Sequence, residues 1–169
     1  KAGFLAGADL TMLAAEFPAM TARRGYEISQ RISGLLRRLE TLGIPSVAIV
    51  DGAALGGGLE LALACTRRLA SENAVLGLPE VNLGLLPAAG GTQRLPRMIG
   101  AKNALDLLLV GKTVDANKAA GLGIVDEIVS AEDSQDVAKR WLLARPAPEQ
   151  PWDRKGYRPP EARGLVLPE

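Results

Sequence analysis

Gly52–Ala64, with the sequence GAALGGGLELALA, is the stretch that decides the fold. It follows Ile44–Val50 (IPSVAIV), a short apolar run rich in β-branched residues, which predicts a buried strand. The leucines and alanines after the glycines predict a helix from about residue 58 to 66. Three successive glycines between strand and helix let other backbone approach closely and leave peptide N–H groups free at the helix N-terminus. The stretch therefore predicts a strand, a glycine turn and a helix of an α/β protein.

A carboxylate, Glu60, falls in the first turn of that helix among leucines. A carboxylate beside aliphatic side chains and exposed N–H donors could serve an acid–base reaction on an acyl group. A tight turn followed by a glutamate that favours the helix N-terminus explains the segment equally well. On these residues alone both interpretations stay open.

Composition excludes several classes of function. The chain has 169 residues, of which 47% are hydrophobic, enough for the core of one domain. A net charge of +1 and only 4% aromatic residues argue against binding nucleic acid. No apolar run approaches the roughly 18–20 residues of a membrane span, and residues 1–20 do not resemble a signal peptide. We expect a cytoplasmic protein without a membrane span.

The residues that are missing restrict the chemistry further. Without histidine, Ser-His-Asp and Cys-His catalysis and His-ligated metals are excluded. The single cysteine, Cys65, allows neither an intrachain disulfide nor a cysteine-cluster zinc site, so we expect it in the core and expect no metal. Acid–base chemistry therefore falls to Asp and Glu, with Lys or Tyr as weaker options.

The rest of the chain alternates between predicted helices and strands. Apolar spacing, glycines and capping residues predict helices over about 20–42, 101–110 and 131–144. Two further helices are predicted: one from Gly91 that Pro96 could interrupt, and a short one capped by Asp115 and ending at Gly121 or Gly123. A return strand is predicted over 66–71 and an edge strand over 124–129.

The C-terminal residues differ in composition. Six of the eleven prolines fall at positions 146, 148, 151, 159, 160 and 168, among charged residues. We expect this stretch to form no regular element and to bury little surface, so 146–169 is predicted to be a Pro-rich linker or tail. Trp152 and Tyr157 could dock locally, or the whole tail could be disordered.

Two further segments form a pattern with the glycine-rich stretch: Phe4–Leu10 (FLAGADL) and Gly77–Pro96 (GLPEVNLGLLPAAGGTQRLP). In their order and spacing, these three segments resemble the motifs of the crotonase (enoyl-CoA hydratase/isomerase) superfamily, and the resemblance extends from residue 1 to about 130. The resemblance is greatest to the hydratase domain of multifunctional fatty-acid oxidation proteins. It implies an α/β fold, a crotonase-type (ClpP/crotonase) spiral of ββα units. The family's first strands have no counterpart here, so we expect an N-terminally incomplete domain over 1–145.

The resemblance also implies roles for individual residues. The N–H groups of Ala8 and Gly57 would form an oxyanion hole for the thioester carbonyl, and Glu60 and Glu80 would be the two catalytic carboxylates. Apolar surroundings would raise the pKa of such carboxyls and suit them to proton transfer. Further substrate-binding positions implied by the resemblance are Ala6, Gly7, Asp9, Gly56, Pro87 and Ala88.

Glutamates at both catalytic positions favour hydration of a 2-trans-enoyl-CoA to a 3-hydroxyacyl-CoA in fatty-acid β-oxidation. The alternatives are a 3-enoyl-CoA isomerase, in which Glu80 alone moves the proton, and a catalytically incompetent fragment that serves only assembly. One position departs from the family, which commonly has glycine where this chain has Ala88. Its added methyl group could crowd the catalytic water or require a different φ and ψ.

The resemblance implies an acyl-CoA substrate and no cofactor in this domain. Residues 146–169 would lead towards a hydroxyacyl-CoA dehydrogenase domain, and NAD would bind only there, because the turn at 52–58 lacks the Gly-x-Gly-x-x-Gly spacing. The possible partners are other copies of the chain or a thiolase subunit. No nucleic acid is expected as a partner.

Overall fold

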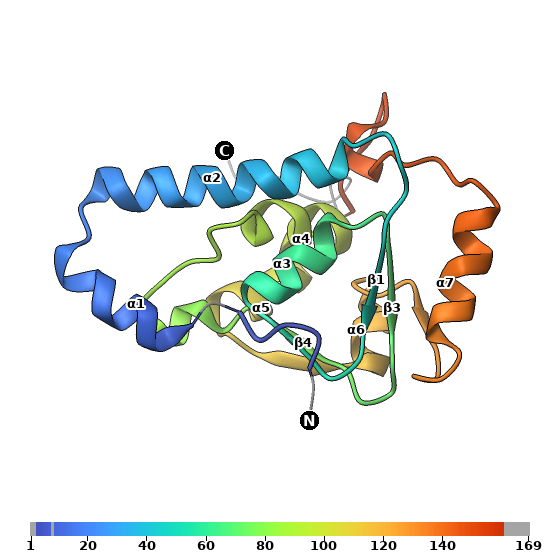
Figure 1. Ribbon diagram of the computed structural model, residues 1–169, viewed down its shortest axis with the longest axis horizontal. Helices are drawn as coiled ribbons and strands as arrows, with labels where there is room; N and C mark the ends of the chain where they lie inside the picture. The colour runs from blue at the N-terminus through green and yellow to red at the C-terminus, as the bar shows by residue number, and fades with distance from the viewer. Residues whose placement is uncertain (1–2, 8, 161–169) are drawn as a thin grey trace, which may run out of the picture.

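A computed structural model describes residues 3–7 and 9–160, arranged as in Figure 1. In chain order its elements are α1 (Leu10–Glu16), η1 (Phe17–Ala19), α2 (Ala22–Glu40), β1 (Val47–Val50), β2 (Ala53–Leu55), α3 (Gly57–Ala64), β3 (Arg67–Ala70), β4 (Val75–Gly77), η2 (Pro79–Leu83), α4 (Gly91–Ile99), α5 (Ala101–Leu109), β5 (Thr113–Asp115), α6 (Ala116–Leu122), β6 (Glu127–Ile128), α7 (Ser134–Leu143) and η3 (Pro151–Asp153), where η marks a 3-10 helix.

The strands form two small sheets that the chain visits in turn. β1, β3 and β6 make one sheet, with β1 parallel to β3 and β3 parallel to β6. β2, β4 and β5 make the other, with β2 parallel to β4 and β4 antiparallel to β5. The chain therefore crosses from the first sheet to the second between β1 and β2, enters α3, and repeats the crossing between β3 and β4. This is a spiral of strand pairs and helices.

Helix α3 lies at the centre of the core (Figure 1). Its Leu59 and Leu63 are fully buried in a cluster with Val50 of β1, Leu76 of β4 and Leu95 of α4. Burial of such side chains contributes roughly 1.5–3 kcal/mol each, so this cluster fixes α3 against both sheets. Cys65 is buried there too, as expected.

The predicted helices and the strands of the first sheet are confirmed to within a few residues. Asp115 caps α6 by accepting a hydrogen bond from the N–H of Lys118 at 2.8 Å, and the helix ends at Gly123, whose φ is 83°. Helix α4 continues through Pro96 without interruption. Helix α1 and strands β2, β4 and β5 were not predicted. Each of the three strands is only three residues long, too short for its alternation to stand out.

The expectation that the tail forms no regular element is wrong at Pro151–Asp153, and Gln150 is buried, whereas residues 151–157 are exposed or half-buried, as expected. Gln150 is 1% exposed, and residues 151–153 form a 3-10 turn. Asp153 pairs with Arg37 of α2, and the hydroxyl of Tyr157 donates to the carbonyl of Arg97 on α4. Polar side chains of this stretch thus bond to α2 and α4, and Gln150 bonds to the buried end of α3.

No helix within residues 3–7 and 9–160 is long and apolar enough to cross a membrane.

Candidate active site

Glu60 lies in the first turn of α3 and is 3% exposed. Its Oε1 accepts two backbone hydrogen bonds, from Ala89 N–H at 2.8 Å and from Gly91 N–H at 2.7 Å. Burial raises the pKa of the Glu60 carboxyl, while the N–H groups of Gly91 and Ala89 and the charge of Arg94 oppose the rise. The carboxylate is thus desolvated but firmly held.

The loop before α4 that holds Glu60 is itself fixed through its carbonyls. Ser29 of α2 donates its hydroxyl to Ala88 O at 2.9 Å, and Arg94 of α4 donates Nη1 to Ala89 O at 2.9 Å. Gly90, between the two N–H donors Ala89 and Gly91, has a φ of 114°, a conformation that favours glycine. The loop can therefore turn its N–H groups inward and its carbonyls outward.

Glu80 lies in the first turn of η2, after Pro79. Its Oε2 is buried and has no hydrogen-bond partner among the described residues. Burial raises the pKa of Glu80, a hydrogen bond from its own backbone opposes this, and the negative charge of Glu60 raises the pKa further. The two carboxyls are therefore coupled by charge.

The glycine turn brings backbone close to Glu80. Gly56 has a φ of 54°, and a Cβ placed there would lie 3.0 Å from Glu80 Oε1. Gly57 is the first residue of α3, where a peptide N–H has no partner within the helix. The N-terminal segment reaches the same turn through Leu5, which pairs with β2 through two hydrogen bonds of 3.0 Å.

These groups surround one cavity of about 420 Å³. Apart from the two glutamates its lining is backbone and aliphatic side chain: Ala6, Gly7, Ile28, Ile32, Leu55, Gly56, Gly57, Pro79, Leu83, Leu85, Leu86, Ala88 and Ala89. A cavity with two carboxyls in an otherwise apolar wall suits an acyl substrate better than a highly charged one.

The structure brings most of the predicted site residues to this cavity. Ala6, Gly7, Gly56, Gly57, Glu60, Glu80 and Ala88 all line it. Asp9 and Pro87 do not: Asp9 accepts a hydrogen bond from Thr11 N–H at 2.8 Å, and Pro87 is buried beside Gly91. Ala8 lies outside the described residues, so its part in an oxyanion hole stays a prediction.

Ala88 keeps an ordinary backbone conformation. Among the described residues other than glycine, only Arg145 has a positive φ. Ala88 therefore lies outside the left-handed region that favours glycine. Its methyl group remains at the cavity wall.

Sequence reasoning missed the apolar residues of the wall. Ile28 and Ile32 of α2 were predicted only as part of a helical stripe, although they line the cavity and remain 37% and 44% exposed. Leu83, Leu85 and Leu86 lie within a segment singled out for its glycines and its glutamate. The available signal was the four-residue spacing of Ile28 and Ile32, but such spacing is equally typical of a buried helix face.

No group of three or more His, Cys, Asp or Glu side chains that could hold a metal gathers within residues 3–7 and 9–160. What the arrangement offers is two coupled carboxyls, a free helix N-terminus and an apolar chamber. A protein-family model described as enoyl-CoA hydratase/isomerase matches residues 1–147. The chain belongs to this family.

Solved structures agree with the family in fold. The chain is 38% identical to Pseudomonas aeruginosa DspI, with a TM-score of 0.76 over 86% of this chain and 55% of that one. It is 38% identical to an enoyl-CoA hydratase from Bacillus anthracis, with a TM-score of 0.73 over 85% of this chain and 55% of that one. The crotonase-type α/β fold expected from the sequence is confirmed.

Curated relatives carry the name of a larger protein. The chain is 47% identical over 151 residues to the fatty acid oxidation complex subunit alpha of Shewanella loihica, covering 87% of this chain and 21% of that protein. It thus spans about a fifth of the length of the curated relatives it matches. The chain is an enzyme of the crotonase superfamily, similar to part of such subunits.

Proposed function

We propose that this domain adds water to a 2-trans-enoyl-CoA and forms a 3-hydroxyacyl-CoA. One observation carries the proposal: two glutamates, coupled by charge, line a single apolar cavity. Hydration requires one group to take a proton from water and another to deliver a proton to C2. Family membership and the relatives named for fatty-acid oxidation support this reaction class.

The two glutamates differ in ways that suggest their roles. Glu60 accepts two backbone hydrogen bonds, which favour its ionised form, so it acts as the base that takes a proton from the attacking water. Glu80 has a desolvated carboxyl facing a like charge, so it holds a proton and gives it to C2. The water oxygen bonds to C3. After the product leaves, Glu60 carries the proton taken from water and Glu80 is ionised. The transfer of one proton from Glu60 to Glu80 through solvent restores the starting state.

The thioester carbonyl gains negative charge during attack. The free N–H of Gly57 at the start of α3 supplies one donor for it, and Ala8 would supply the second by the family resemblance. A pair of such donors is worth several kcal/mol of barrier lowering without any titration.

Beyond this domain, we propose a place in a multifunctional oxidation protein of the cytoplasm. Residues 146–169 would continue towards a dehydrogenase domain that binds NAD, while the hydratase domain uses no cofactor of its own. A thiolase subunit or further copies of the chain would be the partners. The name of the Shewanella relatives supports this arrangement.

A 3-enoyl-CoA isomerase is the second candidate. It is favoured by one feature: backbone N–H groups already engage Oε1 of Glu60, while Glu80 keeps a buried oxygen that has no hydrogen-bond partner within residues 3–7 and 9–160. An isomerase needs only such a single carboxyl, which moves a proton between C2 and C4.

Conservative substitutions distinguish the two candidates in the natural protein. For a hydratase, Glu60→Gln and Glu80→Gln should each lower kcat for crotonyl-CoA hydration by about a hundredfold or more, since proton transfer commonly contributes 10²–10⁴-fold. The exposed Glu132→Gln is the matched control and should retain activity. An isomerase would instead convert a 3-enoyl-CoA, lose activity with Glu80→Gln and keep most of it with Glu60→Gln.

A further inference from the structure

A network of charged side chains extends from the tail to the loop that holds Glu60. At its inner end Arg94 donates Nη1 to Ala89 O at 2.9 Å, and the N–H of Ala89 donates to Glu60 Oε1 at 2.8 Å. Arg94 is only 6% exposed, and a Cβ on Gly90 would lie 2.0 Å from its Nη1. The loop is therefore shaped around this guanidinium group.

Arg94 is oriented in turn by Glu40, the last residue of α2. Its Nε donates to Glu40 Oε1 at 2.7 Å and its Nη2 to Glu40 Oε2 at 3.0 Å, a bidentate pair. Both residues are buried, Glu40 being 7% exposed. Such a pair in a desolvated setting has a fixed geometry, so a displacement of Glu40 moves Arg94.

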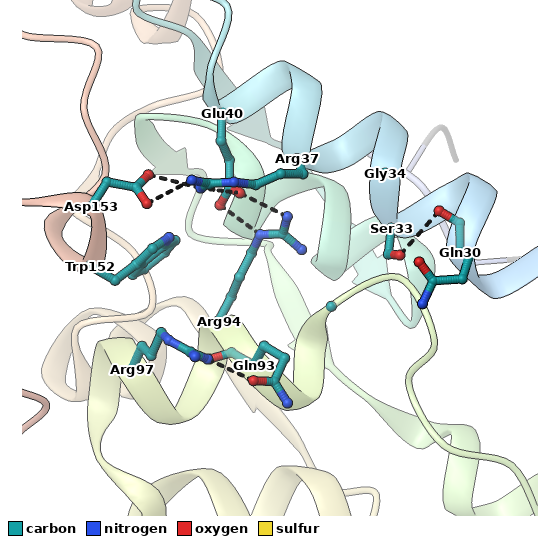
Figure 2. Close-up of a pocket in the computed structure, with 11 residues that line it drawn as sticks. Gln30, Ser33, Gly34, Arg37, Glu40, Gln93, Arg94, Arg97, Trp152 and Asp153 are labelled. Carbon is teal, nitrogen blue, oxygen red and sulfur yellow. Dashed lines mark hydrogen bonds and ion pairs between the residues drawn. The ribbon is translucent and has the colours of Figure 1, made fainter.

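The outer half of this network joins α2 to the tail. Arg37 donates to Glu40 Oε2 at 3.1 Å and forms a second bidentate pair with Asp153, at 2.8 and 2.7 Å. Figure 2 shows Arg37 between Asp153 and Glu40, with Arg94 on the other side of Glu40. The four side chains border a second cavity of about 550 Å³, separate from the one that holds Glu60 and Glu80.

The charges of this four-residue network balance only when Asp153 is included. Arg37 and Arg94 share Oε2 of Glu40, and Asp153 supplies the second negative charge. Without Asp153, Arg37 has only Glu40 left as an anionic partner in the cluster and competes for it with Arg94. Arg94 would then hold Ala89 less firmly.

We propose that Asp153 is a positioning residue for Glu60, acting through three intervening side chains on the peptide of Ala89. This inference rests on the proposed acid–base role of Glu60. Asp153 lies beyond residues 1–147, the part of the chain that the family model matches. The segment that follows the family's domain is thereby coupled to the chemistry of the hydratase site.

The test compares Asp153→Asn with Glu149→Gln in the natural protein. Glu149 is a matched control, because it lies on the same segment and pairs only loosely with Arg154, at 3.9 Å. With crotonyl-CoA, Asp153→Asn should lower kcat by about two- to fivefold, the size of a partly exposed ion pair, and leave KM within about twofold. Asp153→Glu should restore much of the loss. Arg37→Met combined with Asp153→Asn should be no worse than the poorer single variant.

Backbone amide exchange gives a readout that does not depend on activity. In Asp153→Asn the amides of Ala89 and Gly91 should exchange about two- to fivefold faster, while those of β1 stay unchanged. Unchanged exchange at both amides, or an equal acceleration throughout the protein, overturns the inference. Wild-type kcat in Asp153→Asn overturns it too. If the wild type does not hydrate crotonyl-CoA at all, the proposed function fails, and the exchange measurement still decides whether Asp153 fixes the loop.

Discussion

Among single residues, the two glutamates show how the same side chain takes different chemistry from its surroundings. Glu60 is held by two N–H donors, whereas Glu80 faces the charge of Glu60 and has a buried oxygen with no partner in the part of the chain that the structure describes. Desolvation raises the pKa of both carboxyls, and the like charge adds a second upward shift at Glu80. The pair can therefore be ionised at one residue and protonated at the other.

A titration of Glu80 tests this coupling. In Glu60→Gln the negative charge that raises the pKa of Glu80 is gone, so its pKa should fall towards, but not reach, the ordinary value of a glutamate, since burial remains. The glutamine keeps an Oε1 that can accept from Ala89 and Gly91. Carbon NMR of labelled glutamate carboxyls would measure the shift. A pKa of Glu80 that is unchanged or higher in the variant would show that the two groups are not coupled.

At the level of elements, the N-terminal segment packs closely against α3 and contributes Ala6 and Gly7 to the cavity wall. Gly58 lies where Leu5 crosses the helix, and a Cβ there would fall 1.9 Å from the carbonyl oxygen of Leu5. Gly57, one residue earlier, would meet nothing within 4 Å. Two neighbouring glycines thus face quite different space.

This contrast predicts different effects of the same substitution. Gly58→Ala must displace backbone and should cost roughly 1–3 kcal/mol of stability, as overpacked sites do, or detach the segment of Leu5 from β2. Gly57→Ala should change stability by less than about 1 kcal/mol. Chemical denaturation of the two variants measures the difference. Equal stabilities would mean that Leu5 does not pack against α3.

Some of these elements could be predicted from the sequence and others could not. The periodicity of α2 and the apolar run of β1 predict those elements without any partner in view. The strand β2 has three residues and depends on pairing with β4 and Leu5, which local pattern does not encode. Likewise, Glu60 and Glu80 were found by their motif, but the Glu40–Arg94 pair joins residues 54 positions apart with no local signal.

At the scale of the whole molecule, the segment that follows α7 is hydrogen-bonded to the central helix α3. Gln150 donates Nε2 to the carbonyl oxygens of Ala64 and Cys65, each at 3.1 Å. These carbonyls belong to the end of α3, where helical partners are lacking. In Figure 1 the segment that follows α7 returns to the C-terminal end of α2. Residues 150–157 are therefore attached to the packed domain.

Gln150→Ala tests this attachment. The substitution leaves two buried carbonyls with fewer donors and should cost about 1–3 kcal/mol. Glu149→Ala, on the same segment but with a side chain 51% exposed, should change stability by less than about 0.5 kcal/mol. Denaturant midpoints compare the two. A Gln150→Ala protein as stable as the wild type would show that the tail is not held on the domain.

We propose that water is added across a 2-enoyl thioester in the cavity of Glu60 and Glu80. The most direct measurement incubates the natural protein with crotonyl-CoA in water labelled with heavy oxygen and deuterium and analyses the product by mass spectrometry. We expect a 3-hydroxyacyl-CoA with one heavy oxygen at C3 and one deuterium at C2, and no such product from Glu80→Gln on the same timescale. Recovery of an enoyl-CoA that has exchanged deuterium but gained no oxygen would contradict it.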